Sequence, residues 1–142
     1  MSISTPDRSQ VSYRDAIIEA LHGEMQRDPA VILLGEDIGA AGGVFGQTKG
    51  LFAEFGPKRV IDTPISEAGA FGIAVGAAMT GMRPVFEVMF GDFITLIMDQ
   101  LVNQAAKIHY MSNRTGSGCL NSFPRKISGL LPGCCLFRRC LV

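Results

Sequence analysis

The sequence contains no tryptophan, only two histidines, and no cysteine before position 119. A structural zinc site or a disulfide framework needs cysteines or histidines at suitable spacings. Here Cys134 and Cys135 are adjacent, no Cys-x-x-Cys pair occurs, and no histidine follows Cys119. We therefore expect no metal site in this chain.

Long hydrophobic runs are also missing. The longest uncharged run lies between Glu67 and Arg83, and it is too short and too rich in glycine and alanine to span a bilayer. The first residues show no basic region followed by an apolar core, which a secretory signal would need. We therefore expect no membrane association and a cytoplasmic location.

Acidic residues are absent from the last third of the chain. All thirteen lie at or before Asp99, together with seven basic residues, so this part carries a net charge of −6. From Gln100 onward there are six basic residues and no acidic ones. Those in the tail, Arg125, Lys126, Arg138 and Arg139, are too few, and too interspersed with apolar residues, to form a nucleic-acid-binding arm. The sequence thus joins two different compositions, and we expect no nucleic-acid partner.

Hydrophobic periodicity predicts alternating helices and strands. Ser12 begins a capping-box pattern, and Asp28-Pro29 ends the first helix. This alternation predicts an α/β fold with a parallel, doubly wound sheet. Further helices are expected near 48–55, 66–80 and 93–110, and strands at 31–34, 60–62 and 84–88.

The most informative position is Glu67, at the start of a helix whose next fifteen residues carry no charge. A carboxyl at the edge of so apolar a segment can be held in its neutral form near pH 7, where it donates a hydrogen bond. Such a group could protonate a heterocyclic cofactor. Alternatively, Glu67 supplies only the negative charge that the helix dipole favours at an N-terminus, and both interpretations can hold together.

The helix expected over 66–80 consists mostly of glycine and alanine, so its side chains are very small. Glycine costs a helix up to about 1 kcal/mol per residue, so something must compensate, and close approach of another backbone is the usual reason. Tight packing on its own sheet, a partner subunit and a bound cofactor are the alternatives. The small residues are Ala68, Gly69, Ala70, Gly72, Ala74, Gly76, Ala77 and Ala78.

Several segments together resemble the beta subunit of thiamine-diphosphate-dependent 2-oxo acid dehydrogenases. The match runs from about residue 12 to residue 112 and corresponds to the pyrimidine-binding domain of the transketolase-like superfamily. The resemblance implies oxidative decarboxylation of a 2-oxo acid, pyruvate being the expected substrate, with acyl transfer to a lipoyl group. The matching segments are Gly-Glu-Asp at 35–37, Asp-Thr-Pro-Ile-Ser-Glu at 62–67, and the stretches 72–79, 81–84 and 99–107.

The resemblance also assigns site residues. Glu67 resembles the glutamate that hydrogen-bonds the aminopyrimidine ring nitrogen, and its proton favours the imino tautomer of thiamine diphosphate, which acts as electron sink. Met89 and Phe93 match positions that pack on the aminopyrimidine. Glu36 matches an acidic residue near the same pocket, although capping of the following loop explains it equally well.

The resemblance implies an alpha subunit in a heterotetramer and a lipoyl acyltransferase component as partners. In the family, the alpha subunit holds the diphosphate and its Mg²⁺, and a K⁺ site lies in a segment that is not matched here. We therefore expect the chain alone to be inactive. The alternative is a non-catalytic chain that only associates with an alpha subunit.

The expected organisation is a flexible N-terminus at 1–11, the N-terminal part of the pyrimidine-binding domain at 12–113, and an aberrant, frameshifted tail at 114–142. The domain is therefore incomplete, and the frameshift explains why the resemblance stops abruptly. In the family, Gly-Gln and a Val-Pro-Val strand follow this point. Codons for residues 114–119, read one base later, can spell Gly-Gln-Val-Pro-Val-Val.

Sequencing the coding DNA across codons 112–116 tests the frameshift. We expect a single-base difference that restores the family's continuation. An intact frame in independent clones would show that the tail is the native sequence.

Overall fold

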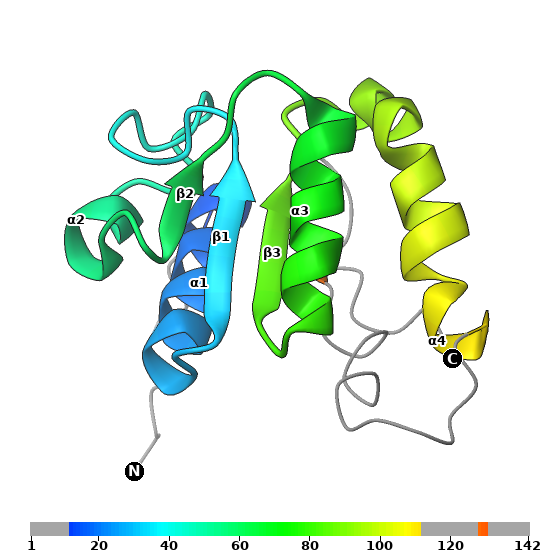
Figure 1. Ribbon diagram of the computed structural model, residues 1–142. Helices are drawn as coiled ribbons and strands as arrows, with labels where there is room; N and C mark the ends of the chain where they lie inside the picture. The colour runs from blue at the N-terminus through cyan, green and yellow to red at the C-terminus, as the bar shows by residue number, and fades with distance from the viewer. Residues whose placement is uncertain (1–11, 112–127, 131–142) are drawn as a thin grey trace, which may run out of the picture.

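Figure 1 shows the computed structural model, which describes residues 12–111 and 128–130. The predictions for 1–11, and for all but three residues of 114–142, lie outside the described residues. The helices are α1 (Tyr13–Arg27), α2 (Leu51–Phe55), α3 (Glu67–Met79) and α4 (Ile108–Met111), with a 3₁₀ helix, η1 (Gly91–Ile97), and a π-helix, η2 (Asp99–Ala105). The strands are β1 (Val31–Gly35), β2 (Val60–Asp62), β3 (Arg83–Glu87) and β4 (Ser128–Leu130).

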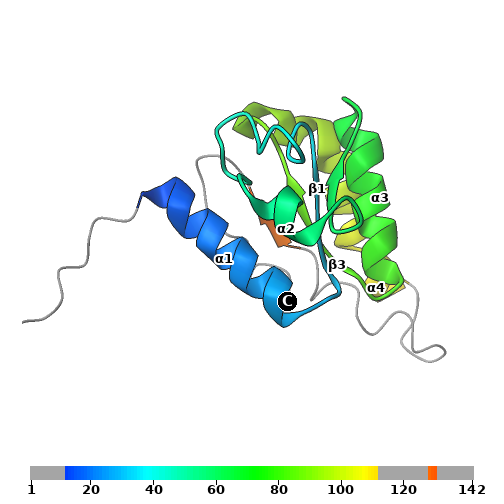
Figure 2. The ribbon, with the colours of Figure 1, turned by 90° about the vertical axis from the view of Figure 1, so that its left-hand side faces the viewer.

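The four strands form one parallel sheet in the order β2–β1–β3–β4. Leu33 in β1 pairs with Val60 on one side and with Val85 on the other. Figure 2 shows α1 on one side of the sheet and α3 on the other. The predicted α/β class with a parallel, doubly wound sheet is confirmed.

Successive residues of β1 point to opposite faces of the sheet, and each face has its own core. Ile32 and Leu34 share a core with α3, whereas Val31 and Leu33 share one with α1 and α2. All five residues of β1 are buried, which explains why the strand is continuously apolar. The packing residues are Ala70, Phe71, Ala74, Val75 and Ala78 on the α3 side, and Leu21, Met25 and Leu51 on the other.

Helix α1 begins where the sequence predicted. The Ser12 hydroxyl accepts a hydrogen bond from the Asp15 backbone N–H at 3.1 Å, which confirms its capping role. At the far end, Arg59 donates to the carbonyls of Met25 and Asp28, each at 3.0 Å. The guanidinium therefore ties the end of α1 to the start of β2, which Arg59 directly precedes.

The single helix expected over 93–110 is wrong in its form, because the chain makes η1, η2 and α4 instead. Residues that join the core shared with α3 recur every four positions, at Ile97, Leu101 and Ala105. Phe93, Ile94 and Ile108 pack against the same core, so the spacing of the apolar residues does not distinguish a continuous α-helix from the three helices observed.

Helix α2 is shorter than expected, because it starts at Leu51 and not near Thr48. Gly50 has a φ of +89°, in the left-handed region. The Thr48 hydroxyl donates to the Ile38 carbonyl at 2.7 Å. The residues just before α2 therefore close the preceding loop.

Strand β4 lies where the sequence showed no sustained hydrophobic period. It pairs with β3 in parallel, with Gly129 opposite Phe86. The sheet thus extends by one strand beyond the three that the sequence predicted.

Within residues 12–111 and 128–130, no helix is both long and apolar enough to cross a membrane. In the same residues, no three histidine, cysteine, aspartate or glutamate side chains form a group that could hold a metal ion.

Candidate functional site

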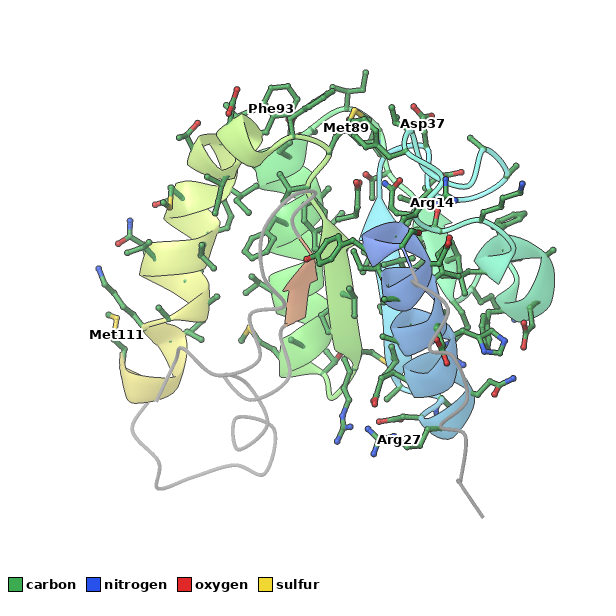
Figure 3. All side chains as sticks on the ribbon, turned by 180° about the vertical axis from the view of Figure 1, so that it is seen from behind. Arg14, Arg27, Asp37, Met89, Phe93 and Met111 are labelled. Atoms are coloured by element: carbon green, nitrogen blue, oxygen red, sulfur yellow. The ribbon has the colours of Figure 1, made fainter. Side chains whose placement is uncertain are left out.

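The carboxyl ends of β1, β2 and β3 meet at one edge of the sheet, the edge at which open α/β folds bind ligands. Glu36 and Asp37 directly follow β1, and Met89 lies two residues beyond β3. In Figure 3, Asp37, Met89 and Phe93 lie at the same end of the molecule. The sheet edge therefore gathers Glu36, Met89 and Phe93, three of the four predicted site residues.

Glu67 reaches the same edge because it is the first residue of α3, the helix that follows β2. Its side chain is half-buried. Ser66 occupies the predicted N-cap position, but its side chain makes no capping hydrogen bond. The position of Glu67 in the first turn suits the helix dipole and also leaves its carboxyl at this edge of the sheet.

Glu36 interacts electrostatically with Glu67. Burial, and then the charges of Glu67 and Asp37, raise the pKa of Glu36 above its ordinary value. The backbone N–H of Ser66 opposes this by stabilising the ionised carboxylate. The structure thus brings the two predicted carboxyls together, and their surroundings favour a proton on Glu36.

Met89 and Phe93 supply apolar surface at the same edge, and both side chains are half-buried. Phe93 lies in the first turn of η1, and its backbone N–H donates to the Phe90 carbonyl at 3.0 Å. The two phenylalanine rings meet edge to face, with centroids 5.4 Å apart. Phe93 is thus held by its neighbour as well as by the core.

Glu87, the last residue of β3, was not among the residues predicted from the sequence. Its side chain is buried, with 3% of its surface exposed, and its Oε1 accepts a hydrogen bond from Gln47 Nε2 at 2.8 Å. Its Oε2 has no hydrogen-bond partner among the described residues. An acidic residue inside the apolar run Pro-Val-Phe-Glu-Val was the available signal, because a buried carboxylate needs a reason.

Burial raises the pKa of Glu87 to about 7, against the lowering effect of the Gln47 hydrogen bond and with a further increase from the charge of Glu36. A carboxyl whose pKa is raised by folding binds more protons folded than unfolded. Its contribution to stability is therefore fully present below about pH 4.5, the ordinary value, and is lost as the pH rises to about 7.

Gly35 provides the space for the Glu87 side chain. A Cβ atom at Gly35 would lie 2.9 Å from Glu87 Cβ, 3.2 Å from Glu87 Oε2 and 3.1 Å from Ile38 Cγ2. These distances are too short for ordinary packing. The glycine that begins the Gly-Glu-Asp segment is therefore explained by the buried carboxyl beside it.

Packing of α3 on the sheet explains only some of the small residues in this helix. The buried alanines face the core, but a Cβ at Gly76 would meet nothing within 4 Å, and Ile73 is 63% exposed. Packing on its own sheet, one of the three alternatives, therefore explains the alanines and leaves Gly76 without a reason within the described residues.

Comparison with known proteins gives one family match. Residues 9–118 match the family described as transketolase, pyrimidine binding domain.

Individual relatives are beta subunits of larger enzymes. The chain is 50% identical over 109 residues to the 2-oxoisovalerate dehydrogenase subunit beta of Bacillus subtilis (strain 168), covering 77% of this chain and 33% of the relative. It is 52% identical over 113 residues to the acetoin:2,6-dichlorophenolindophenol oxidoreductase subunit beta of the same organism, covering 71% and 33%. The mitochondrial pyruvate dehydrogenase E1 component subunit beta of Homo sapiens is 48% identical over 109 residues, covering 77% and 30%. The chain thus spans about a third of the length of these curated relatives.

Replacing Gly35 by alanine tests the contact with Glu87. We expect Gly35→Ala to lower the free energy of unfolding by about 1–3 kcal/mol, because the new methyl group overpacks the site. The control is Gly23→Ala, an exposed position inside α1 where a Cβ meets nothing within 4 Å. It should be neutral or stabilising by up to about 1 kcal/mol. Urea unfolding of the three chains measures both, and an equal effect at the two glycines would contradict the contact.

Proposed function

We propose that this chain forms the pyrimidine-binding side of a thiamine diphosphate site in the beta subunit of a 2-oxo acid dehydrogenase. The premise is that the chain belongs to the family of transketolase pyrimidine-binding domains. The observation that carries the proposal is the pairing of Glu67 with Glu36 at the carboxyl edge of the sheet. Met89 and Phe93 lie at that same edge.

The acidic pair suits a ring nitrogen. Two carboxyls that repel each other while partly desolvated favour a state in which a proton is retained. A retained proton makes a carboxyl a hydrogen-bond donor, which an ionised carboxylate is not. In the proposal, Glu67 makes the hydrogen bond to the pyrimidine nitrogen, and Glu36, whose pKa is raised by burial and by the charge of Glu67, is the neighbouring carboxyl that retains a proton.

Met89 and Phe93 act in the proposal by excluding water from the pyrimidine ring. An aromatic face can stack on a flat heterocycle, and a thioether adapts to its outline. Both lower the local polarity around the acidic pair, which strengthens any hydrogen bond made there. Thiamine diphosphate, when bound, supplies an electron sink for decarboxylation.

The proposed substrate class is a 2-oxo acid, with pyruvate as the substrate expected from the sequence. The relatives are named for 2-oxoisovalerate, acetoin and pyruvate, and their identities to this chain lie between 48% and 52%. Because these identities are so similar, they do not indicate which of the three compounds this chain would act on. Two of the three, 2-oxoisovalerate and pyruvate, are 2-oxo acids, whereas acetoin is a hydroxy ketone. The proposal therefore rests on the class that the first two share, with an acyl group passed to a lipoyl acceptor.

The proposed partners are an alpha subunit, which holds the diphosphate and Mg²⁺, and a lipoyl acyltransferase component. The outer face of α3 supports an association. Ile73 is 63% exposed there, and Gly76 leaves room for close approach of another backbone. Ile65, just before α3, is 86% exposed. Exposed apolar groups of this kind are typical of surfaces that pack against another chain.

Glu67→Gln tests the proposed hydrogen bond to the pyrimidine. The purified chain is mixed with the alpha subunit of a 2-oxo acid dehydrogenase, and thiamine diphosphate binding with Mg²⁺ is followed by calorimetry. We expect binding to weaken about tenfold, because a neutral amide replaces a carboxyl whose hydrogen bond to the ring nitrogen is charge-assisted and therefore stronger. The matched control is Glu19→Gln, the same change at an exposed position of α1. Unchanged affinity in Glu67→Gln, or association with the alpha subunit without any cofactor binding, would contradict the proposal.

A further inference from the structure

Gln47 holds the long loop between β1 and α2, residues 36–50, to the sheet. Its side chain is buried, and its amide makes two hydrogen bonds in opposite directions. Nε2 donates to Glu87 Oε1 at 2.8 Å, and Oε1 accepts from the backbone N–H of Phe45 at 3.0 Å. The amide thus links a buried carboxyl on β3 to the loop backbone two residues before Gln47.

The loop is built around this amide. Gly43, with a φ of +83°, lies so close that a Cβ there would be 2.6 Å from Gln47 Cδ. Its backbone N–H donates to the Asp37 carbonyl at 2.8 Å, and the N–H of Thr48 donates to the Gly42 carbonyl at 3.0 Å. The loop therefore folds over Gln47, and the Gln47 amide fills its interior.

Ring contacts continue from the loop to the candidate site. The rings of Phe45 and Phe90 meet edge to face with centroids 5.8 Å apart, and Phe90 meets Phe93 in the same way at 5.4 Å. Phe45 is 50% exposed and Phe90 is 44% exposed, so core packing does not fully fix either ring. The position of Phe93 thus depends partly on where the loop holds Phe45.

We propose that Glu87 is a positioning residue. Through its hydrogen bond to Gln47 it fixes the position of the loop, and through the Phe45–Phe90–Phe93 ring contacts the loop fixes the position of Phe93 at the candidate site. The part that concerns the pocket rests on the proposed function, because it takes Phe93 as the wall of a cofactor site. The part that concerns the loop stands on the contacts alone.

The proton on Glu87 favours the closed loop. When the loop is closed, the carboxyl is buried with one donor, Gln47, and the charge of Glu36 repels its ionised form. When the loop opens, water reaches the carboxyl, and its pKa falls toward the ordinary value. By linkage, raising the pH from about 5 to about 8 removes a contribution that stabilises the closed loop.

The other charged groups around the loop do not contact Glu87. On β2, Asp62 Oδ1 accepts the Gly39 N–H at 2.7 Å. Arg14 of α1 approaches the loop at Gly46, where its Cδ would lie 3.9 Å from an added Cβ. On the loop itself, Asp37 and Lys49 are exposed. The titration of Glu87 is therefore the change that reaches Gln47 directly.

Hydrogen exchange of the 142-residue chain tests whether the proton on Glu87 stabilises the closed loop. Peptides across residues 38–50 are followed by mass spectrometry between pH 5 and pH 8. After correction for the intrinsic exchange rate, we expect protection of the loop amides to fall at least about fivefold over this range. Glu87→Gln cannot titrate and should show no such fall. Glu19→Gln, the exposed control, should behave as the unmodified chain does. Equal pH profiles for Glu87→Gln and the unmodified chain would overturn the proposal.

Gln47→Met keeps the inference testable if Glu87→Gln does not fold. Methionine has a similar shape but makes neither hydrogen bond, so loop protection should be lower at every pH. It should still fall as the pH rises, because burial of Glu87, which raises its pKa, does not depend on Gln47. Protection equal to that of the unmodified chain would overturn the role of Gln47.

Phe90→Leu tests the link to the pocket in the mixture with the alpha subunit. We expect thiamine diphosphate affinity to fall several-fold, and unchanged affinity would overturn that link. If the unmodified chain binds no thiamine diphosphate, the proposed function fails. The hydrogen-exchange result still decides whether Glu87 and Gln47 hold the loop.

Discussion

The buried carboxyl of Glu87, hydrogen-bonded to Gln47 across the end of the sheet, is the constraint on which the rest of the site depends. It requires a glycine at position 35, because a side chain there would occupy its space. It holds the long loop by one amide, and it lies close enough to Glu36 for their charges to interact. Because the carboxyl is removed from water with a single donor, its charge state is coupled to the closure of the loop above it.

The fold was predictable where local sequence decides it. The Ser12 cap and the strand Val60–Asp62 were predicted correctly, since hydroxyl capping and short apolar runs act over a few residues. The division of the 93–110 segment into η1, η2 and α4 was not predictable, because its apolar residues are spaced as in a continuous α-helix. The start of α2 was missed because the Thr48 hydroxyl bonds to Ile38, ten residues earlier.

The candidate site divides in the same way. Glu67, Glu36, Met89 and Phe93 were found through resemblance to a family, and the structure places them at one sheet edge. Glu87 and Gln47 were not found, although both are buried polar residues, because their bond joins positions forty residues apart. A polar residue within an apolar strand can be recognised from sequence, but its partner cannot.

The most direct test of this account is an NMR titration of the Glu87 carboxyl carbon in the 142-residue chain, assigned through its loss in Glu87→Gln. The account predicts a midpoint of about 7, because burial outweighs the Gln47 hydrogen bond. A midpoint near 4.5, the ordinary value for glutamate, would show that water reaches this carboxyl and would contradict the coupling between its proton and the loop.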